Sequence, residues 1–329
     1  MKKITLFILI SFFMITANAQ NANIDKEAFA HTFSIVAKDP GTGEMAIAVQ
    51  SHWFSVGSLV SWGKSGVGVV ATQSFVNPAY GPNGLKLMSG GMSAKDALEE
   101  LVKQDEGRDY RQVAFLDVQG NVAAYTGKLC VEAASHIEGE NFSVQANMML
   151  NNKVVPAMAE AFKAHENLPL AEKMIEVLKA AQNAGGDIRG KQSAALIVVG
   201  PKKVENSWEE KKIDLRVDDH QNPILELERL LKTARAYEHM NKGDLAVEKG
   251  EVDIALEEYG IAEEMFPDNL EMKFWKAVAM ANSDRLKEAL PVFATIFEED
   301  DNWREMITRL PKAGLLNLTE EEIDQITDL

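Results

Sequence analysis

The sequence predicts two regions of different fold: a layered domain of strands and helices over residues 32–201, and an acidic, all-helical region after it. The first region holds 18 of the 22 glycines, and glycine supplies the positive φ angles that tight connections between strands need. Its near-continuous apolar runs at residues 67–71 and 194–199 indicate sheets that are covered on both faces. Residues 202–329 carry 31 Asp and Glu against 17 Lys and Arg, a net charge of −14, in a composition that favours helices.

Seven segments of the first region have the apolar or alternating pattern of β-strands, and turn-forming residues separate several of them. Residues 39–43, with the sequence DPGTG, form a turn between the first two segments, and Gly120 lies in the turn of a hairpin. The predicted strands are residues 32–38, 45–51, 56–62, 67–73, 112–117, 122–126 and 194–199.

Three further segments of this region have the 3.6-residue periodicity of helices. They are residues 94–102, 154–165 and 170–184. Ser93 and Asp96 form a variant of the capping box before the first helix, and Gly185 is a suitable residue to end the third. The order of strands, helices, strands, helices and a last strand predicts stacked layers of sheet and helix.

The acidic region contains a repeat of 34 residues. Ala255, Tyr259 and Ala262 recur as Ala289, Phe293 and Ile296, at the spacing of the tetratricopeptide pattern. We expect a tetratricopeptide-like helical domain over residues 223–329, in which a helix at 223–240 covers the two copies, with residues 202–222 as a linker. A plain acidic helical bundle is the alternative.

The first residues of the chain have the features of a secretory signal peptide. Lys2 and Lys3 precede an apolar run at residues 4–15, and Ala17-Asn18-Ala19 matches a cleavage signal. The run is too short to span a bilayer, and no cysteine follows it to carry a lipid, so we expect no stable membrane anchor. The sequence therefore predicts a signal peptide at 1–19, a short N-terminal extension at 20–31, and an exported protein, periplasmic or extracellular.

Composition excludes several classes of function. The formal charge of −16 repels phosphate backbones, so we expect no nucleic-acid partner. A single cysteine, Cys130, excludes an internal disulfide and a Cys-based zinc site, and is more typical of a buried thiol than of a nucleophile. Residues 185–192 resemble a phosphate-binding loop, but Gln192 replaces the Mg²⁺-binding hydroxyl and the segment runs from a helix into a strand. We expect no cofactor and no metal.

Polar residues are concentrated where the predicted strands end. Clustered hydrogen-bonding side chains of this kind can form a site for a polar small molecule. Ordinary turn chemistry explains some of them but not the repeated glutamines. The sequence therefore predicts a binding site formed by Ser51, Thr72, Gln73, Ser74, Asn77, Tyr80, Asn147, Asp187, Arg189 and Gln192.

Several separated blocks, among them HTFSIVAKDPGTGEMAIAVQS, GVGVVATQSFVNPAYGPNGL and GGDIRGKQSAALIVV, resemble domain-of-unknown-function family 1028. The resemblance covers roughly Ala30 to Pro201 and implies membership of the N-terminal nucleophile hydrolase superfamily. It therefore implies an α+β fold, a four-layer αββα sandwich, followed here by the all-α tetratricopeptide-like domain. Members of that superfamily often associate, so the resemblance also makes a homo-oligomer an expectation.

The resemblance also implies catalytic residues. Thr32 occupies the place of the nucleophile, whose own α-amine serves as base once the His31–Thr32 bond is cut. Ser34 lies on the same face of the strand, and Ser193 with Asp187 resembles the late support for the nucleophile. Lys64 lies at the sequence distance of the activating lysine, and a solvated turn residue is the alternative interpretation. The backbone N–H groups of residues 72–74 would stabilise the oxyanion. Gln50 replaces the carboxylate of proteasome-like members, a departure from the pattern.

We therefore expect an exported amidohydrolase that acts on a small amide or peptide-like substrate. The alternative is a non-catalytic protein that binds a ligand or cell-wall fragment and holds a protein partner through the helical tail. In both cases the acidic helical region is the expected partner surface, and the nearly neutral first region is the expected place of the chemistry.

Overall fold

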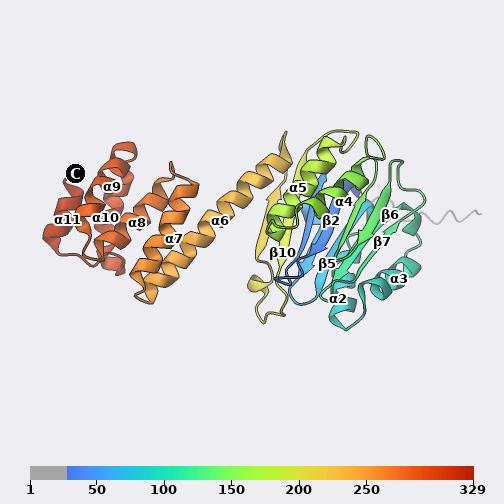
Figure 1. The fold of residues 1–329 in the computed structure, drawn as a ribbon, viewed down its shortest axis with the longest axis horizontal. Coiled ribbons are helices and arrows are strands. Elements are labelled where there is room, and N and C mark those ends of the chain that lie inside the picture. Colours follow the sequence, from blue (N-terminus) through green and yellow to red (C-terminus); the bar gives the residue numbers. More distant parts are fainter. Residues whose placement is uncertain (1–27) are drawn as a thin grey trace, which may run out of the picture.

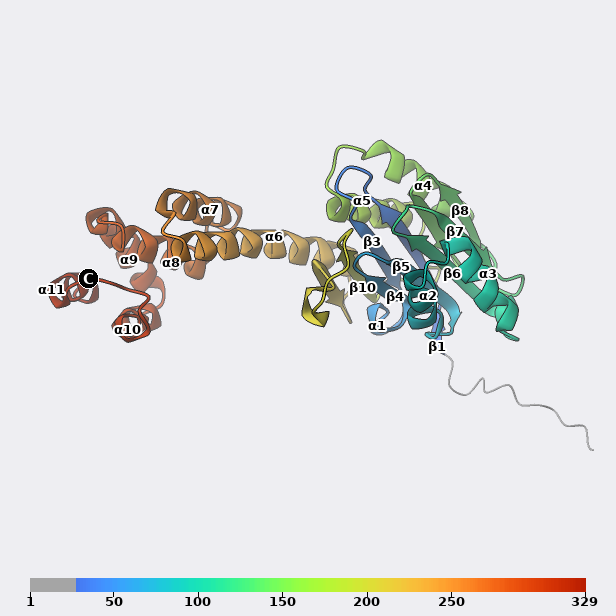
Figure 2. The ribbon, with the colours of Figure 1, turned by 90° about the horizontal axis from the view of Figure 1, so that it is seen from below.

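A computed structural model describes residues 28–329, so the predicted signal peptide and most of the predicted N-terminal extension lie outside the described residues. The described chain has a mixed α/β part built on two antiparallel sheets and a separate helical part (Figure 1). One long helix, α6 (Pro223–Glu248), runs between them (Figure 2).

The larger sheet has the strand order β11-β10-β3-β2-β9-β8. Its central pair has the bounds that the sequence predicted, because the turn at residues 39–43 separates two strongly apolar strands. The strands are β2 (Thr32–Lys38), β3 (Met45–Ser51), β8 (Ser135–Gly139), β9 (Phe142–Ala146), β10 (Ser193–Val199) and β11 (Ile213–Val217).

The smaller sheet has the order β1-β5-β6-β7, with β4 also paired to β5. The predicted hairpin is confirmed, and it forms β6 and β7. The strands are β1 (Ala28–Ala30), β4 (Ser61–Lys64), β5 (Gly68–Val76), β6 (Arg111–Asp117) and β7 (Val122–Thr126).

The two sheets pack against each other, and helices cover the outer face of each. Strand residues alternate between the two faces of a sheet, so in β2 Phe33 and Ile35 pack with α4 (Val154–Ala164) and α5 (Leu170–Asn183). Val36 of the same strand faces the smaller sheet. That sheet turns its other face, with Val70 and Phe115, to α2 (Tyr80–Ser89) and α3 (Ala94–Gln104). Figure 2 shows α4 and α5 on one side of the sheets and α2 on the other.

Residues 56–62 were expected to be a strand, and this expectation was wrong. Ser55 adopts a positive φ of 53°, after which the chain forms the short helix α1 (Gly57–Val60) before β4 begins. A side chain at Gly57 would place its Cβ 2.5 Å from the Cβ of Ala195, so the missing side chain lets this turn lie directly on β10. The tight contact, and not the apolar composition, decides the local structure.

Residues 202–222 are not a simple linker. Their strand β11 pairs antiparallel with β10 at the end of the larger sheet, where Ile213 and Val217 are buried. The alternation of Ile213, Leu215 and Val217 is the pattern of a strand with one buried face. Likewise, residues 28–30 of the predicted N-terminal extension form β1, which pairs with β5.

The helical part follows from α6 in antiparallel succession. Its helices are α7 (Val252–Met265), α8 (Leu270–Ala281), α9 (Leu286–Glu299), α10 (Asn302–Arg309) and α11 (Glu320–Thr327). α7 and α9 begin and end 34 residues apart, which agrees with the repeat in the sequence. In residues 28–329, every helix is too short or too polar to cross a membrane.

α6 belongs to both parts of the molecule. Near its start, Ile224, Leu227 and Leu231 are buried in the core that the larger sheet forms with α4 and α5. From its middle onward, Ala236, Met240 and Ala246 pack in the core formed with α7 and α8. The helix was expected to end at Met240 but continues to Glu248 without interruption.

Candidate functional site

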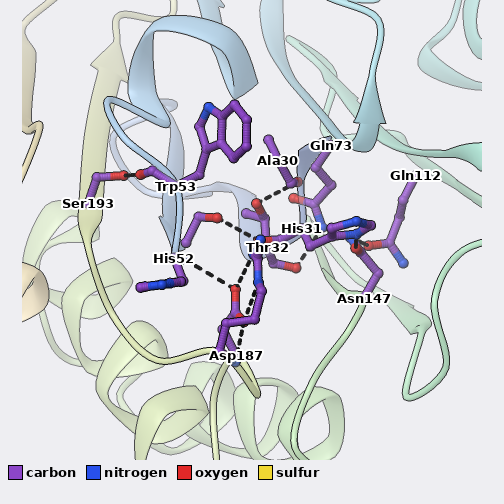
Figure 3. Close-up of polar contacts among 12 residues, drawn as sticks. Ala30, His31, Thr32, His52, Trp53, Gln73, Gln112, Asn147, Asp187 and Ser193 are labelled. Carbon is purple, nitrogen blue, oxygen red and sulfur yellow. Dashed lines mark hydrogen bonds and ion pairs between the residues drawn. The ribbon is translucent and has the colours of Figure 1, made fainter. Parts of the chain in front are cut away.

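The candidate site lies where the chain passes from one sheet to the other. Ala30, at the end of β1, pairs with Ser74 of the smaller sheet, whereas Thr32, at the start of β2, pairs with Ser51 of the larger sheet. His31 is the single residue between the two strands, and both His31 and Thr32 are buried. The His31–Thr32 peptide bond is therefore enclosed between the ends of the two sheets (Figure 3).

The carbonyl oxygen of His31 is held by two side-chain donors. The Ser51 hydroxyl donates a hydrogen bond to it at 2.5 Å, and Nη2 of Arg189 donates another at 2.8 Å. One of these donors carries a positive charge, so negative charge that develops on this oxygen would be stabilised in a buried setting. The arrangement has the form of an oxyanion site, built around the carbonyl that precedes Thr32.

Asp187 fixes the position of the Arg189 guanidinium. Nε and Nη2 of Arg189 donate to the two carboxylate oxygens at 3.0 and 2.7 Å, and the backbone N–H of Arg189 donates to the same carboxylate at 2.9 Å. The Asp187 side chain has an exposure of 0 %, and it also accepts a 3.2 Å bond from the backbone N–H of His52. A bidentate pair of this kind orients the planar guanidinium before any reaction begins.

Thr32 faces the space between the sheets, with its hydroxyl donating to the Ala30 carbonyl at 2.7 Å. Among residues 28–329, the partner described for the Thr32 hydroxyl is therefore a backbone oxygen and not a side-chain base. The Thr32 carbonyl accepts from the backbone N–H of Asn147 at 3.1 Å and from Nε2 of Gln73 at 3.3 Å. Polar contacts on both sides therefore hold the residue in place.

Ser34 and three glutamines form a buried amide network next to Thr32. The Ser34 hydroxyl donates to Oε1 of Gln73 at 2.6 Å and accepts from Nε2 of Gln145 at 2.7 Å. Nε2 of Gln73 donates onward to Oε1 of Gln112 at 2.7 Å. Buried polar groups of this kind must be paired to be tolerated, so Ser34 has a structural role in the network.

His31 is connected to the same network through Asn147. Nδ2 of Asn147 donates to Gln112 at 2.9 Å, which leaves Oδ1 of Asn147 to accept from Nδ1 of His31 at 2.8 Å. The His31 ring also meets the edge or face of the Phe75 ring, with centroids 5.7 Å apart and the planes nearly perpendicular. Burial lowers the pKa of His31 below its ordinary value, and the charge of Arg189 acts in the same direction, while the hydrogen bond to Asn147 and the charge of Asp187 oppose the shift.

Ser51 and Ser193 lie next to each other on β3 and β10, and Ser51 is the one that faces Thr32. The Ser193 hydroxyl donates to the Trp53 carbonyl and accepts from the backbone N–H of Val56 at 3.1 Å. It lies two strands from Thr32, roughly 10 Å at the usual strand spacing. Ser193 therefore fixes the 53–56 loop and does not contact the threonine.

Lys64 was a candidate for the activating lysine near the amine of Thr32, with a solvated turn residue as the alternative, and the structure agrees with the alternative. Lys64 is an exposed residue that pairs with Gly68, at the opposite end of β5 from Ser74. Gly68 and Ser74 are six positions apart along the strand, about 20 Å. The cation beside the His31–Thr32 bond is Arg189, which comes from the loop between α5 and β10.

Three predicted binding residues lie on the side of the smaller sheet that α2 and α3 cover, and not on the side of Thr32. Val70 packs under α2 and α3, and the two-residue period of β5 turns Thr72 to the same side, where its hydroxyl donates to the Asn77 carbonyl. The Asn77 side chain accepts from the backbone N–H of Ala79, and Tyr80 donates to Asp105. Burial and the Asp105 carboxylate raise the pKa of Tyr80. Thr72, Asn77 and Tyr80 therefore stabilise the outer helices and do not line the site.

Two further predicted binding residues, Ser74 and Gln192, lie beside the site and contact it through the backbone. Ser74, with a φ of 75°, is buried where β5 pairs with β1, while Gln192 connects its backbone to Ser51 and His220. The expected oxyanion donors at residues 72–74 are not the ones found, since side chains of Ser51 and Arg189 hold the carbonyl.

Gln50, which stands where a carboxylate was expected, points away from Thr32. Its ladder partners Phe33 and Ala194 both pack toward α4 and α5, so Gln50 lies on that face of the sheet. Its replacement of the carboxylate therefore has no direct effect on Thr32. Both atoms of its buried amide have no hydrogen-bond partner among residues 28–329.

Cys130 is a half-buried thiol whose Sγ donates to the Arg111 carbonyl at 3.3 Å. Burial raises its pKa, which opposes the formation of a thiolate nucleophile. Within residues 28–329, no group of three or more His, Cys, Asp or Glu residues is arranged to hold a metal ion.

Sequence reasoning missed the roles of His31 and Gln112. Gln112 lies in a strand on the same face as the buried residues Ala114 and Leu116, which the two-residue period of the strand predicts. A glutamine on the buried face of a strand is itself a signal of an internal polar network. His31 gave no such signal, because its role comes from its position between two strands of different sheets.

Comparisons with known proteins support the family resemblance. The family model described as "Family of unknown function (DUF1028)" matches residues 32–227. The crystal structure of protein SPO2555 from Silicibacter pomeroyi, described with the same family model, is 33 % identical, with a TM-score of 0.56. The similarity covers 62 % of this chain and 89 % of that chain. No curated protein matched this chain.

Proposed function

Because the chain belongs to the family of unknown function DUF1028, we propose an activity from the site itself: an exported amidohydrolase with an N-terminal threonine nucleophile. The nucleophile would be Thr32 Oγ, which acquires its base when the His31–Thr32 bond is cut. The substrate would be a small amide or a peptide-like molecule.

The observation that carries this proposal is the double hydrogen bond to the His31 carbonyl. A carbonyl at the entry of a strand needs one ordinary partner, whereas this one has a hydroxyl and a guanidinium that is itself fixed by a buried carboxylate. Donors that are oriented in advance stabilise a developing oxyanion most effectively. The bond that these donors polarise is the bond whose cleavage would free the amine of Thr32.

The proposed cleavage needs no group beyond the chain and water. Thr32 Oγ attacks the His31 carbonyl carbon and closes a five-membered ring, while Ser51 and Arg189 stabilise the oxyanion. The C–N bond then breaks, the proton of the hydroxyl ends on the Thr32 nitrogen, and an ester joins His31 to Thr32 Oγ. Water hydrolyses the ester to the His31 carboxylate and a Thr32 with a free hydroxyl and amine.

After cleavage, the new α-amine would act as the general base for Thr32 Oγ on a substrate amide. In the uncut chain the Thr32 hydroxyl donates to the backbone carbonyl of Ala30, which cannot act as a base. The amine created by cleavage at the same residue would supply the proton acceptor. Arg189 would lie near this amine, and a neighbouring cation lowers the pKa of an amine and keeps it neutral. This is the role that the resemblance gave to Lys64.

The architecture agrees with this proposal. A nucleophile at the start of a central strand, between two packed sheets with outer helices, is the arrangement that the N-terminal nucleophile hydrolase resemblance implies. The predicted signal peptide accounts for export. The 34-residue offset of α7 and α9 supports a tetratricopeptide-like tail as a surface for a protein partner.

The test is the intact mass of the full chain after export from a bacterial host. We expect a break before Thr32 in the unmodified chain and in Thr32→Ser, and none in Thr32→Ala, because only the first two have a hydroxyl nucleophile. Thr42→Ala, in the exposed 39–43 turn, is the matched control and should be cut normally. A folded chain that stays whole would overturn the proposal and favour the non-catalytic, ligand-binding alternative.

A further inference from the structure

The segment that would be released by cleavage occupies a slot next to Thr32. Ala28, Phe29 and Ala30 pair antiparallel with Val76, Phe75 and Ser74, so β1 is an added strand at one edge of β5. Farther along the same edge, residues 68–71 of β5 are already paired with β4. The slot is therefore a short gap in a sheet edge, three residues long, that ends at the nucleophile.

Cutting the chain after His31 would open this gap. A pairing of only three residues binds weakly once the covalent link is gone, since isolated strand pairs are marginal in water even when longer, so the cleaved segment dissociates and another peptide can take its place. Once the segment leaves, the backbone groups of residues 74–76 that pair with β1 lose those partners, while the Phe75 carbonyl keeps its 2.7 Å hydrogen bond from Nη1 of Arg111. A sheet edge opened in this way accepts another extended peptide.

The second part of the slot is the pocket between Phe75 and Asn147 that holds the His31 side chain. The His31 ring lies against Phe75, and its Nδ1 donates to Oδ1 of Asn147, whose own amide nitrogen is committed to Gln112. Asn147 therefore presents a fixed acceptor to whatever side chain enters. A neutral, planar side chain with an N–H donor, such as His, Asn or Gln, satisfies this acceptor.

Charge adds a further restriction at the same place. Arg189 donates to the carbonyl of the residue in this position, and its charge acts on the His31 ring more strongly than the opposing charge of Asp187 does. A Lys or Arg side chain in the pocket would add a second cation to a buried setting, which is unfavourable. The pocket therefore discriminates between neutral and cationic donors.

We propose that the mature protein takes the acyl part of its substrate as an extended peptide. The peptide adds as a strand to residues 74–76 of β5, and a neutral side chain with an N–H donor enters the Phe75–Asn147 pocket. This inference rests on the proposed function and narrows its substrate class from small amides in general to peptides.

The test compares p-nitroanilides as substrates of the self-cleaved full chain. Acetyl-Ala-Phe-Ala-His-anilide reproduces residues 28–31, acetyl-His-anilide lacks the strand, and acetyl-Ala-Phe-Ala-Lys-anilide changes the charge in the pocket. We expect kcat/KM for the second and third compounds to be at least tenfold below that for the first. The liberated nitroaniline is followed by absorbance, and the mass of the chain is recorded in the same samples.

A specificity variant distinguishes recognition by Asn147 from a structural effect. Asn147→Asp replaces the neutral acceptor with an anionic one, so we expect the ratio of Lys to His hydrolysis to rise at least tenfold. General damage to the site would lower both rates and leave the ratio unchanged, which would contradict the pocket assignment.

The two proposals fail in different ways. A self-cleaved chain that hydrolyses acetyl-His-anilide as fast as the tetrapeptide would overturn the strand-addition proposal and leave the amidohydrolase proposal intact. A chain that stays whole, or a cleaved chain that hydrolyses none of the anilides, would overturn both.

Discussion

The polar contacts around the His31–Thr32 bond have two different physical roles. The bonds from Ser51 and Arg189 reach the carbonyl oxygen, where they would stabilise charge as it develops. The bonds from the backbone N–H of Asn147 and from the Gln73 side chain reach the Thr32 carbonyl and fix the strand. Substitutions of Ser51 or Arg189 should therefore change the rate of cleavage, while a substitution of Gln73 should change stability as well.

The first prediction concerns Arg189→Gln. Hydrogen bonds from charged groups contribute about 1.5–3 kcal/mol, so their loss in the transition state should slow cleavage of the 31–32 bond roughly 10- to 150-fold. The rate is measured from the fraction of whole chain over time by mass spectrometry. Arg216→Gln, which removes a partly exposed ion pair to Asp214 on β11, is the control.

Equal cleavage rates in Arg189→Gln and Arg216→Gln would remove Arg189 from the mechanism. A failure of Arg189→Gln to fold would have a separate cause, because the substitution leaves the buried Asp187 carboxylate without its guanidinium partner. Circular dichroism of each variant separates the two effects.

The second prediction concerns pH and His31. Burial holds the pKa of His31 below its ordinary value of 6.5, so the unfolded chain binds a proton at a higher pH than the folded chain does. The folded state therefore loses stability as pH falls below about 6.5, until the lower, folded-state pKa is passed. We expect urea unfolding of uncut Thr32→Ala to show a fall in stability from pH 7.5 to 5.5.

Carboxylates titrate over part of the same range, so the comparison is with Thr32→Ala/His31→Gln. Gln at position 31 keeps an N–H donor for Asn147 and cannot be protonated in this range. The fall in stability should be smaller in the double variant, and an identical fall in both would contradict the assignment to His31.

The sequence predicted which polar residues lie close together where the strand pattern was sufficient. Thr32, Ser51 and Asn147 lie at strand ends that meet in space, and the family resemblance added the importance of the first. Lys64 was misplaced because a distance along the sequence does not say at which end of a strand a residue lies. Arg189 was included only for its polarity, since its bond to His31 crosses 158 positions of sequence.

Among the secondary-structure elements, those with both a clear pattern and a clear stop were the most predictable. β2 and β3 have the predicted bounds, and α3 begins after Ser93, whose side chain accepts from the backbone N–H of Asp96. β8 was missed because it is short, polar at several positions and without a strong apolar run. β9 was missed although all of its residues are buried, because polar Ser143 and Gln145 interrupt its apolar residues. α1 was predicted as strand because the contact of Gly57 with Ala195 cannot be read from local sequence.

The third prediction concerns the packing of α6 on α7. A Cβ at Gly243 would lie 2.4 Å from the ring of Tyr259, which is buried and hydrogen-bonded to Asp244 at 2.6 Å. Gly243→Ala should therefore destabilise the helical part by about 1–3 kcal/mol through overpacking. Thermal unfolding followed at 222 nm, the usual helix wavelength, checks this.

Gly260→Ala on α7 is the matched control. The nearest atom to an added Cβ there is Nζ of Lys276 at 3.9 Å, so the helix gains up to about 1 kcal/mol from the better propensity of alanine. We expect Gly243→Ala to lower the stability and Gly260→Ala to raise it. A change in stability of the same sign for both would contradict the close contact between Gly243 and Tyr259.

At the scale of the whole molecule, the α/β part does not end where the composition changes. β11 and the first turns of α6 complete the core of the larger sheet, and the family match likewise extends to residue 227. The composition of residues 202–329 is acidic throughout, so it could not separate the turns that belong to the first core from those that belong to the second.

The fourth prediction follows from this boundary. A chain that ends after Glu238 keeps Ile224, Leu227 and Leu231 in the core, and keeps the ion pair of Arg235 with Glu172. A chain that ends after Asn222 loses three buried side chains, each contributing about 1.5–3 kcal/mol. We expect the longer truncation product to melt cooperatively near the full chain and the shorter one to melt far lower or to aggregate.

Circular dichroism melts of the two products, with limited proteolysis as a second readout, check this prediction. Equal melting temperatures would show that α6 is only attached to the α/β part and does not stabilise it.

The uninterrupted helix α6 also determines how charge is distributed in space. Its 26 residues span about 39 Å, and the part of the chain after residue 201 carries a net charge of −14. The molecule is elongated, with the helical part at one end (Figure 1). Because most of its negative charge lies toward that end, it has a large electric dipole moment along its axis. Near an anionic polymer or surface, the resulting torque turns the helical end away, within the roughly 8–10 Å over which salt leaves the field unscreened. The α/β end, with the His31–Thr32 site, would therefore approach such a surface first.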